Sequence, residues 1–537
     1  MTSGVGSGVD SAVGGAAWGG GGLQAVTRSA ASAGMSRTIH AVWGHHAPMH
    51  RLLLVVLLLA GCAPSAVVPE RTADLALTEC RIPGVRAAAR CGTWTVPENP
   101  DQPDGRTIDL KVVVQPATDR PVASDPVFFL AGGPGQGATE VMARVPFLWD
   151  TNKHRDVVWV DMRGTGGSNK LTCPPPDPTD LAARLELDAG LEEIDDCLAA
   201  LDADTTQYTT PRLVADLDAV RAALGYDVIN LYGGSYGTRL GLAYIAAHED
   251  RVRSAVLDGL APYAMKLFLT FGEDGKAALD RVFAACVADP SCAEAFPNLE
   301  ARFWPWLDGL RPADGNPPTT VTVRDPRTGH RTLDLPLDRD GVASAIRGLL
   351  YGTEMASLLP LALHQAIEGD PEALISQALI LGDGMEESMA PGLMMSVACA
   401  EDVARITDAD RAALASEPFL GTALLDMVIA SCERWNVGTV PDSLFDPVTS
   451  DVPILLLSGA EDPVTPERWA AEAAKTLSNA TSLTVPATGH IASNAGCAPE
   501  HLADFYEDPN PAMSHDFSCL QDIERPPFFV AFTGPTP

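Results

Sequence analysis

The chain has 537 residues, 46% of them hydrophobic, and carries a formal net charge of −33. This length allows a large core and a second, smaller domain. The acidic balance argues against nucleic acid as a partner, because a polyanion would be repelled. Otherwise it indicates only a well-solvated surface.

Residues 1–48 are rich in Gly, Ala and Ser without a hydrophobic period, so no fold is expected there. Residues 49–61 have a basic start, an apolar run too short to span a membrane and small residues before Cys62, which is typical of a signal peptide. Leu59-Ala60-Gly61-Cys62 resembles the lipobox of bacterial lipoproteins, which implies cleavage before Cys62 and a lipid anchor on its thiol. A plain secretory signal or a retained membrane anchor is the alternative.

Because Met49 would open a signal of ordinary length, we expect residues 1–48 to be a mis-assigned start or to be removed. A linker follows over 62–79. The mature protein is then expected in the cell envelope, attached to a membrane through Cys62 on its periplasmic or extracellular face.

The cysteines support export. With Cys62 set aside for lipid, an even number remains, and these fall into pairs that are local in sequence. An oxidising compartment with five disulfides is the natural interpretation, whereas free thiols in the cytosol would not fit the signal. The expected pairs are Cys80–Cys91, Cys173–Cys197, Cys286–Cys292, Cys399–Cys432 and Cys497–Cys519.

From Cys80 the chain alternates short apolar runs with helical segments, and Gly-rich loops follow the runs. This pattern predicts a mostly parallel α/β sheet flanked by helices. A helix is expected over 211–224, capped by Thr210, with Pro211 at its first position. Strands are expected at 108–114, 126–130, 156–160, 228–232 and 255–257.

The alternation stops over 262–450, where helical and irregular segments predict a mostly helical cap. The sheet pattern resumes at 451, with runs at 454–457 and 482–485. We therefore expect one sheet domain made of 80–261 and 451–537, interrupted by the cap. Cap helices are expected at 268–285, 340–350, 355–367 and 371–381, with a loop or small hairpin at 312–336.

Ser235 stands in a Gly-x-Ser-x-Gly pentapeptide between a predicted strand and a predicted helix. In that context the turn is sharp, Gly233 and Gly237 leave room for it, and the serine hydroxyl is exposed as a nucleophile. The N–H of Tyr236 would then point to the developing oxyanion. The alternative is a glycine-rich turn with an incidental serine.

A serine hydroxyl needs a base and an acid that holds the base. His490 is the candidate base, because it follows a predicted strand and a glycine. Asp462 is the candidate acid, because it comes after a strand and is followed by Pro463. Asp258, which also ends a strand, is the rival acid.

The second oxyanion N–H is expected from Gly133, in the loop after the strand at 126–130. The glycines of this loop lack the spacing of a dinucleotide fingerprint, and no Gly-Lys-Ser/Thr follows for a P-loop. The chain has no Cys-x-x-Cys motif, so redox and zinc-ribbon functions have no support. Neither a metal nor a cofactor is expected.

Together these motifs resemble the α/β-hydrolase fold of the prolyl iminopeptidase and tripeptidyl aminopeptidase family of serine peptidases. Two departures stand out: Ala131 precedes the glycine loop where many relatives have His, and Ile491 follows His490 where Gly is common. Asp161 and Arg163 are interpreted as structural. The matching stretches are Gly132-Gly133-Pro134-Gly135, Asp161-x-Arg163-Gly164-x-Gly166-x-Ser168, Gly233-Gly234-Ser235-Tyr236-Gly237, Gly459-x-x-Asp462-Pro463-x-Thr465-Pro466, Gly489-His490 and the region 452–519.

The resemblance implies an exported serine peptidase that acts on peptides with a free N-terminus. An esterase of the same fold is the first alternative, since the fold does not determine the acyl group. A non-catalytic peptide-binding lipoprotein is the second. The segment 396–402 resembles a Cys-x-acid element of the relatives, which implies that Glu401, braced by Cys399–Cys432, binds the substrate ammonium. Asp402, Glu433 and Glu273 are the rivals for this role.

Overall fold

The structure is a computed structural model that describes residues 74–174, 194–311, 319–326, 328–330, 332–386, 388–510 and 516–534. Contacts divide the chain after Pro69, and the described residues belong to the second unit, Glu70–Pro537. The expected signal segment 49–61 and Cys62 lie outside the described residues. Within the described part of the chain, no helix combines the length and the apolar character that crossing a bilayer requires.

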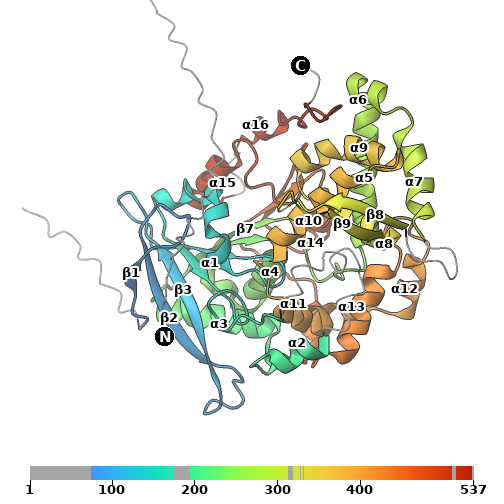
Figure 1. Ribbon diagram of the computed structural model, residues 1–537. Helices are drawn as coiled ribbons and strands as arrows, with labels where there is room; N and C mark the ends of the chain where they lie inside the picture. The colour runs from blue at the N-terminus through green and yellow to red at the C-terminus, as the bar shows by residue number, and fades with distance from the viewer. Residues whose placement is uncertain are drawn as a thin grey trace, which may run out of the picture. The chain divides into compact units, whose positions relative to one another are not determined.

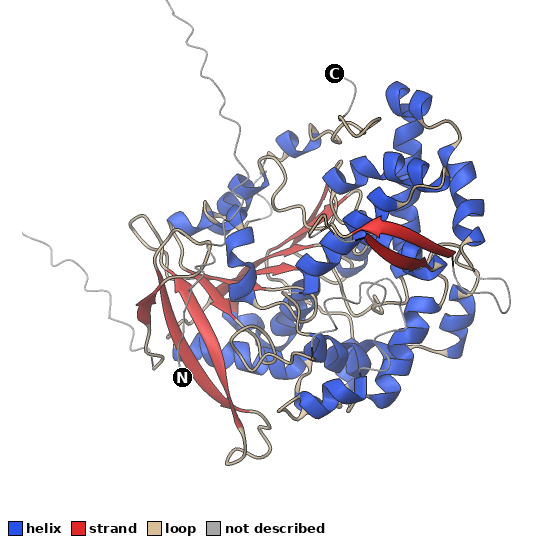
Figure 2. Ribbon diagram, viewed as in Figure 1, coloured by secondary structure: helices blue, strands red, loops and turns tan. Residues whose placement is uncertain are grey.

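A nine-stranded sheet forms the centre of the second unit (Figures 1 and 2), in the order β1-β2-β3-β5-β4-β6-β7-β10-β11. The pairs from β5 to β11 are parallel, and β1, β2 and β3 add an antiparallel edge. The expected strands are all present, whereas β1 and β2 were not expected. The bounds are β1 Thr78–Cys80, β2 Ala89–Pro97, β3 Thr107–Gln115, β4 Val127–Leu130, β5 Val157–Val160, β6 Ile229–Gly234, β7 Val252–Asp258, β10 Ile454–Gly459 and β11 Ala480–Val485.

Alternate residues of each strand enter opposite cores, as the two-residue period of a strand requires. On one face, residues such as Leu231 and Leu456 pack with α3 and α4. On the other face, Tyr232 and Leu457 pack with α1 and α15. The bounds of the helices around the sheet are α1 Ala138–Val141, α2 Ile194–Ala200, α3 Thr210–Ala223, α4 Tyr236–His248, α14 Glu467–Ala473, α15 Ala498–Glu507 and α16 Ser518–Gln521.

The start of α3 differs from the expectation. Thr210 is the first helical residue rather than the cap, and the capping position belongs to Thr209, whose side chain makes no capping bond. The reason is tertiary: the Thr210 hydroxyl and N–H both donate to Glu401 from a distant segment.

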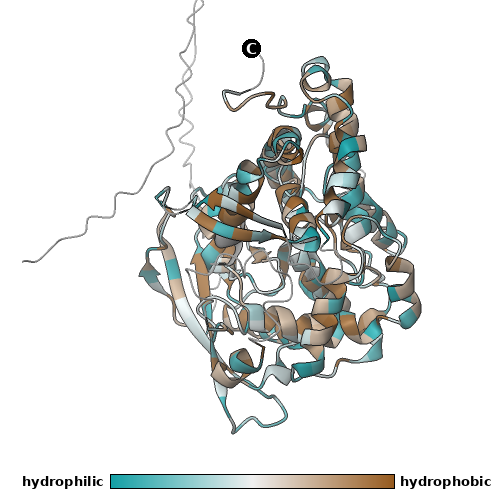
Figure 3. Cartoon of the chain, turned by 45° about the vertical axis from the view of Figure 1, so that its right-hand side comes forward, coloured by the Kyte–Doolittle hydropathy of each residue, from teal (hydrophilic) through white to brown (hydrophobic). Residues whose placement is uncertain are grey.

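Between β7 and β10 the chain builds a separate apolar cluster from helices and a β-hairpin of β8 Thr319–Arg324 and β9 Thr332–Leu337. Hydrophobic and hydrophilic residues are mixed along these helices (Figure 3), as expected for elements with one buried face. The helices of the whole segment between β7 and β10 are α5 Phe271–Ala288, α6 Pro290–Ala295, α7 Leu299–Gly309, α8 Arg339–Leu349, α9 Thr353–Ile367, α10 Glu372–Glu386, α11 Pro391–Val397, α12 Asp408–Leu414 and α13 Ala423–Arg434.

The five expected disulfides are all present. Asp161 and Arg163 also have the structural contacts expected of them. The Asp161 carboxylate accepts hydrogen bonds from the N–H groups of Thr139 and Gly167. Arg163 forms a two-pronged pair with Asp216, with Nε–Oδ2 at 2.7 Å and Nη2–Oδ1 at 2.8 Å.

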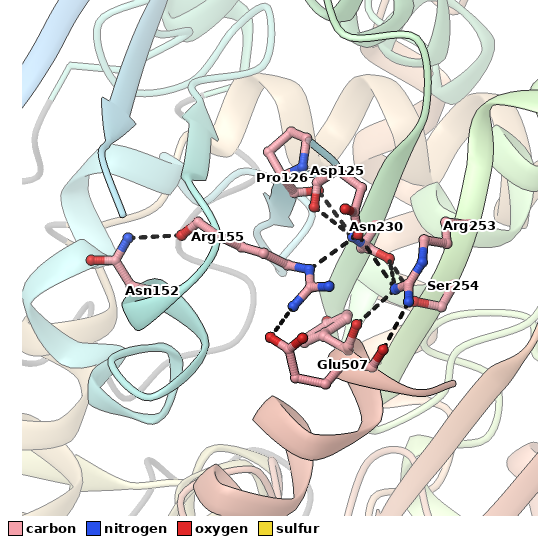
Figure 4. A network of polar contacts seen from close by, with 9 residues as sticks. Asp125, Pro126, Asn152, Arg155, Asn230, Arg253, Ser254 and Glu507 are labelled. Atoms are coloured by element: carbon pink, nitrogen blue, oxygen red, sulfur yellow. Dashed lines mark hydrogen bonds and ion pairs between the residues drawn. The ribbon is translucent and has the colours of Figure 1, made fainter. Parts of the chain in front are cut away.

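A polar network joins the amino ends of the parallel strands to the end of α15 (Figure 4). Arg155 binds Asp125 and Glu507, and Arg253 donates to the carbonyl of Tyr506 at 2.7 Å. Asn230 donates to the Asp125 carbonyl. The network therefore joins the C-terminal part of the chain to the first part. It lies at the amino ends of the strands, whereas Ser235 lies at the carboxyl end of β6.

Candidate active site

Ser235 occupies the turn between β6 and α4, and its backbone has φ 56° and ψ −124°. The glycines on either side are needed for close approach. A Cβ at Gly237 would lie 2.1 Å from the carbonyl oxygen of Leu130, and one at Gly233 would lie 2.4 Å from that of Gly237. Gly234 and Tyr236 are buried but Ser235 is partly exposed. This is the strained elbow expected of a nucleophilic serine.

His490 and Asp462 are brought together by the loops after β11 and β10. His490 Nδ1 lies 2.9 Å from Asp462 Oδ2. Asp462 is fully buried, and its other oxygen accepts the N–H groups of Val464 and Thr465. These bonds keep the carboxylate ionised and aim it at the imidazole.

The electrostatics of the pair are mutual. Burial alone would raise the pKa of Asp462, but the charge of His490 and the hydrogen bonds lower it below its ordinary value. Burial alone would lower the pKa of His490, but Asp462 outweighs it, so the pKa is raised. A carboxylate that stabilises an imidazolium in this way is what a general base needs.

Asp258, the rival acid, makes different contacts. Its carboxylate accepts the N–H of Ala492 at 2.9 Å and the N–H of Ser493 at 2.7 Å. The Ser493 hydroxyl and the Tyr232 hydroxyl also donate to it. Asp258 therefore holds the loop that carries His490, while Asp462 binds the imidazole itself.

Thr465 contacts both members of the pair, a role that its place in the sequence motif does not by itself predict. Its hydroxyl lies 2.8 Å from Asp462 Oδ2 and 3.1 Å from His490 Nδ1. The Asp-Pro-x-Thr-Pro spacing was the available signal, since a residue three positions after Asp462 in a turn can return to its carboxylate.

The loop after β4 lies directly against the serine. A Cβ at Gly132 would be 3.1 Å from the Cβ of Ser235, and Gly133 has φ 109°, a conformation that favours glycine. The Gly135 carbonyl accepts the N–H of Ala390. The candidate oxyanion loop is therefore adjacent to the nucleophile and is covered by the segment before α11.

Tyr236 is buried, and its hydroxyl lies 2.6 Å from the hydroxyl of Thr210. Glu401 is buried on the other side of Thr210, in the π-helical turn Ala398–Asp402. The Glu401 carboxylate accepts the Thr210 N–H at 2.7 Å, the Thr210 hydroxyl at 2.8 Å and the Tyr263 hydroxyl at 3.0 Å. Burial raises the pKa of Glu401 to about 7.

The rivals of Glu401 lie apart from this chain of hydrogen bonds. Asp402 forms a buried ion pair with Arg239. Glu273 pairs with Arg468 at the surface, and Glu433 is exposed. Glu401 is therefore the acid that hydrogen bonds connect to the residue after the candidate nucleophile.

The inserted segment also contacts the candidate base. The backbone N–H of His490 donates to the Tyr351 carbonyl at 2.8 Å, and the two rings meet edge to face at 5.3 Å. Ile491 has φ 76°, a conformation that favours glycine. Its Cδ1 lies 3.3 Å from where a Cβ on Gly234 would be, so the isoleucine lies against the elbow.

Among the described residues, Cys497, His501 and Cys519 form a group of metal-ligand type. Cys497 and Cys519 are joined by a disulfide, and disulfide sulfurs are not the thiolates that bind metals. This group therefore does not fit a metal ion.

Two family models match the chain. The model for the alpha/beta hydrolase fold matches residues 125–284, and the model for TAP-like proteins matches residues 417–519.

Among the similar proteins is the serine protease Hip1 of Mycobacterium tuberculosis, 26% identical over 508 residues, covering 84% of this chain and 94% of Hip1. The tripeptidyl aminopeptidase of Streptomyces lividans is 32% identical over 323 residues, covering 57% of this chain and 56% of that protein. The proline iminopeptidase of Xylella fastidiosa is 32% identical over 135 residues, covering 25% and 32%. The chain therefore has the α/β-hydrolase fold with a TAP-like C-terminal region, and it is similar to serine peptidases.

Proposed function

We propose that this protein is an exported serine aminopeptidase that releases residues or short peptides from free N-termini through an acyl-enzyme on Ser235. The observation that carries the proposal is the 2.9 Å bond between His490 and buried Asp462, in a chain whose serine occupies the elbow after β6. The similarity to a serine protease and to aminopeptidases supports a peptide as the substrate.

The chemistry follows from these positions. His490 Nδ1 is bound to Asp462, so Nε2 takes the proton of the Ser235 hydroxyl as Oγ attacks the carbonyl carbon. The carbonyl electron pair moves onto oxygen, where the N–H groups of Gly133 and Tyr236 stabilise the charge. The C–N bond then breaks as His490 returns the proton to the leaving amine, and water hydrolyses the ester by the same route.

A fluorophosphonate probe tests the nucleophile, because it reacts only with an activated serine. We expect labelling of the folded wild-type protein and none of Ser235→Ala. Ser416→Ala, at an exposed serine, is the matched control and should label like the wild type. An unlabelled wild-type protein would favour the peptide-binding lipoprotein instead.

Glu401 is the proposed acceptor of the substrate ammonium. The support is its place in the hydrogen-bond chain through Thr210 to Tyr236 and its one remaining acceptor position on Oε1, which receives a single bond. Against this stands its complete burial, with both oxygens already bonded within the protein. A structural carboxylate would have the same contacts. The two roles therefore differ only in how a substitution of Glu401 affects substrates with and without a free amine.

Glu401→Gln separates them. For an amine-binding residue, kcat/KM on free-amine peptides should fall by about 2–4 kcal/mol of transition-state stabilisation. Hydrolysis of N-blocked peptides and small neutral esters should change little. Glu433→Gln is the matched control, at an exposed acid of α13. An equal loss on all substrates would assign Glu401 to structure, and faster turnover of esters than of any peptide would favour the esterase.

Export and a lipid anchor at Cys62 are proposed from the lipobox-like segment and from the disulfides, which are typical of an oxidising compartment. Cys62→Ser should release the protein from the membrane fraction of cells that produce it. Retention of the variant in the membrane would contradict the anchor.

A further inference from the structure

Arg347 is a buried cation in the inserted segment, on α8. Only 8% of its surface is exposed. Its guanidinium carbon lies 4.0 Å from the centre of the Phe271 ring and 5.6 Å from that of Tyr351. Its Nε and Nη2 atoms are buried and have no hydrogen-bond partner among the described residues.

This isolation sets Arg347 apart within the described chain, where every other buried arginine pairs with a carboxylate. The paired ones are Arg155, Arg163, Arg221, Arg239 and Arg339. Aromatic rings offset only part of the cost of burying a cation. Although the chain has 70 Asp and Glu residues, one buried guanidinium among the described residues has no carboxylate paired with it.

Arg347 lies close to the candidate base, His490. The ring of Tyr351, which Arg347 contacts, packs on the His490 ring, and the Tyr351 carbonyl accepts the backbone N–H of His490. The charge of Arg347 reaches the imidazole, where it lowers the pKa of His490 against the effect of Asp462. A group bound to Arg347 would therefore lie beside the candidate base.

The two unpartnered nitrogen atoms of Arg347 indicate which chemical group it would bind. Nε and Nη2 form one edge of the guanidinium, and Arg163 uses the same edge to hold both oxygens of Asp216. That edge matches a carboxylate in a two-pronged pair. We infer that Arg347 binds a carboxylate of the substrate, so that this peptidase prefers peptides with an anionic group near the scissile bond. This inference rests on the proposed function.

A carboxylate can come from the C-terminus of a short peptide or from an Asp or Glu side chain. Two substrate pairs distinguish these sources: one peptide as its free acid and its C-terminal amide, and one with Glu and with Gln near the scissile bond. The wild-type protein should prefer the acid member of at least one pair by about ten- to hundredfold in kcat/KM, the range for hydrogen bonds to charged groups.

Arg347→Met should bring that ratio close to one, mainly by slowing the acid member. Arg347→Lys should give an intermediate ratio, because it keeps the charge without the fork. Arg302→Met, at a cap arginine that pairs with Glu368, is the matched control and should keep the wild-type ratio. A wild-type ratio near one for both pairs, or a ratio unchanged by Arg347→Met, would overturn the inference. An equal loss on both members, with a lower melting temperature, would also overturn it and assign Arg347 to bracing the cap.

A binding measurement keeps this test separate from the proposed function. In the Ser235→Ala background, calorimetry with the same peptides should show tighter binding of the acid member, lost when Arg347→Met is added. If the wild-type protein is not labelled by fluorophosphonate yet this preference appears, the peptidase proposal fails and the carboxylate site stands. Labelling without any acid preference gives the opposite result.

Discussion

His490 is oriented by two side chains from a single turn, Asp462 and Thr465. Thr465 bonds to the same carboxylate oxygen that receives the imidazole N–H. Its hydroxyl therefore helps to determine both the charge of the acid and the angle of the base. At the residue scale, the candidate machinery depends on these two contacts in addition to Ser235.

Thr465→Val removes the hydroxyl and keeps the shape. We expect kcat to fall about tenfold or more with KM little changed, because a hydrogen bond to a charged group contributes about 1.5–3 kcal/mol. Steady-state kinetics on a neutral ester measure this effect. Thr484→Val, at an exposed position of β11, should leave kcat unaltered. A KM effect alone would place Thr465 in substrate binding instead.

The pH dependence of the rate reports the base. Asp462 and, more weakly, Asp258 raise the pKa of His490 against burial and Arg347. Since the neutral imidazole is the base, kcat/KM on a neutral ester should rise with pH through a titration above the ordinary 6.5. Arg347→Met should move this titration to higher pH, because it removes a positive charge. A titration at or below 6.5 in the wild-type protein would contradict this electrostatic description.

At the scale of elements, the start of α3 is stabilised by a carboxylate from the inserted segment. The first N–H groups of a helix have no partner within it, and they favour negative charge. Glu401 accepts the Thr210 N–H, and Arg239 and Asp402 form a buried pair beside it. This contact joins α3, α4 and the π-helical turn behind Tyr236.

Glu401 makes stability depend on pH. Its pKa rises from 4.5 to about 7 on folding, so between these values the folded state binds more protons than the unfolded state. Its contribution is therefore complete below pH 4.5 and is lost as the pH rises through about 7. We expect the free energy of unfolding of Glu401→Gln to fall less than that of the wild type over this range, by on the order of 1–3 kcal/mol.

Urea denaturation at a series of pH values measures this difference. Other buried acids, such as Asp216 and Asp274, contribute equally to both proteins and cancel. Parallel curves for the two proteins would mean that Glu401 stays ionised throughout.

At the scale of the whole molecule, Arg155 connects segments that are far apart in sequence (Figure 4). Its contacts with Asp125 and Glu507 join the first part of the sheet domain to the end of α15. Arg155→Met should lower the free energy of unfolding by about 1–3 kcal/mol, since the partly buried carboxylate of Asp125 loses a charged partner. Arg144→Met, at an exposed arginine, is the control for chemical denaturation. Equal stability of the two variants would show that the network contributes nothing.

The sequence by itself determined the features that depend on neighbouring residues. The strand before Ser235 and the glycines around it are local, because apolar periodicity and turn sterics act within a few residues. The disulfides join cysteines 6–33 positions apart, and the turn after β10 folds Thr465 back on Asp462. The edge strands β1 and β2 are not predicted by the sequence, because part of each is exposed and their hydrophobic residues follow no clear period.

Tertiary structure alone decided which distant groups meet. Asp258 and Asp462 both follow strands, and only the packing of the His490 loop assigned one to the imidazole and the other to the backbone. The contact of Glu401 with Thr210 spans 191 residues, and Tyr351 reaches His490 from within the insertion. No periodic pattern encodes such contacts, because they depend on how two separately packed apolar clusters meet. For the same reason, the unpaired guanidinium of Arg347 became visible only in the folded chain.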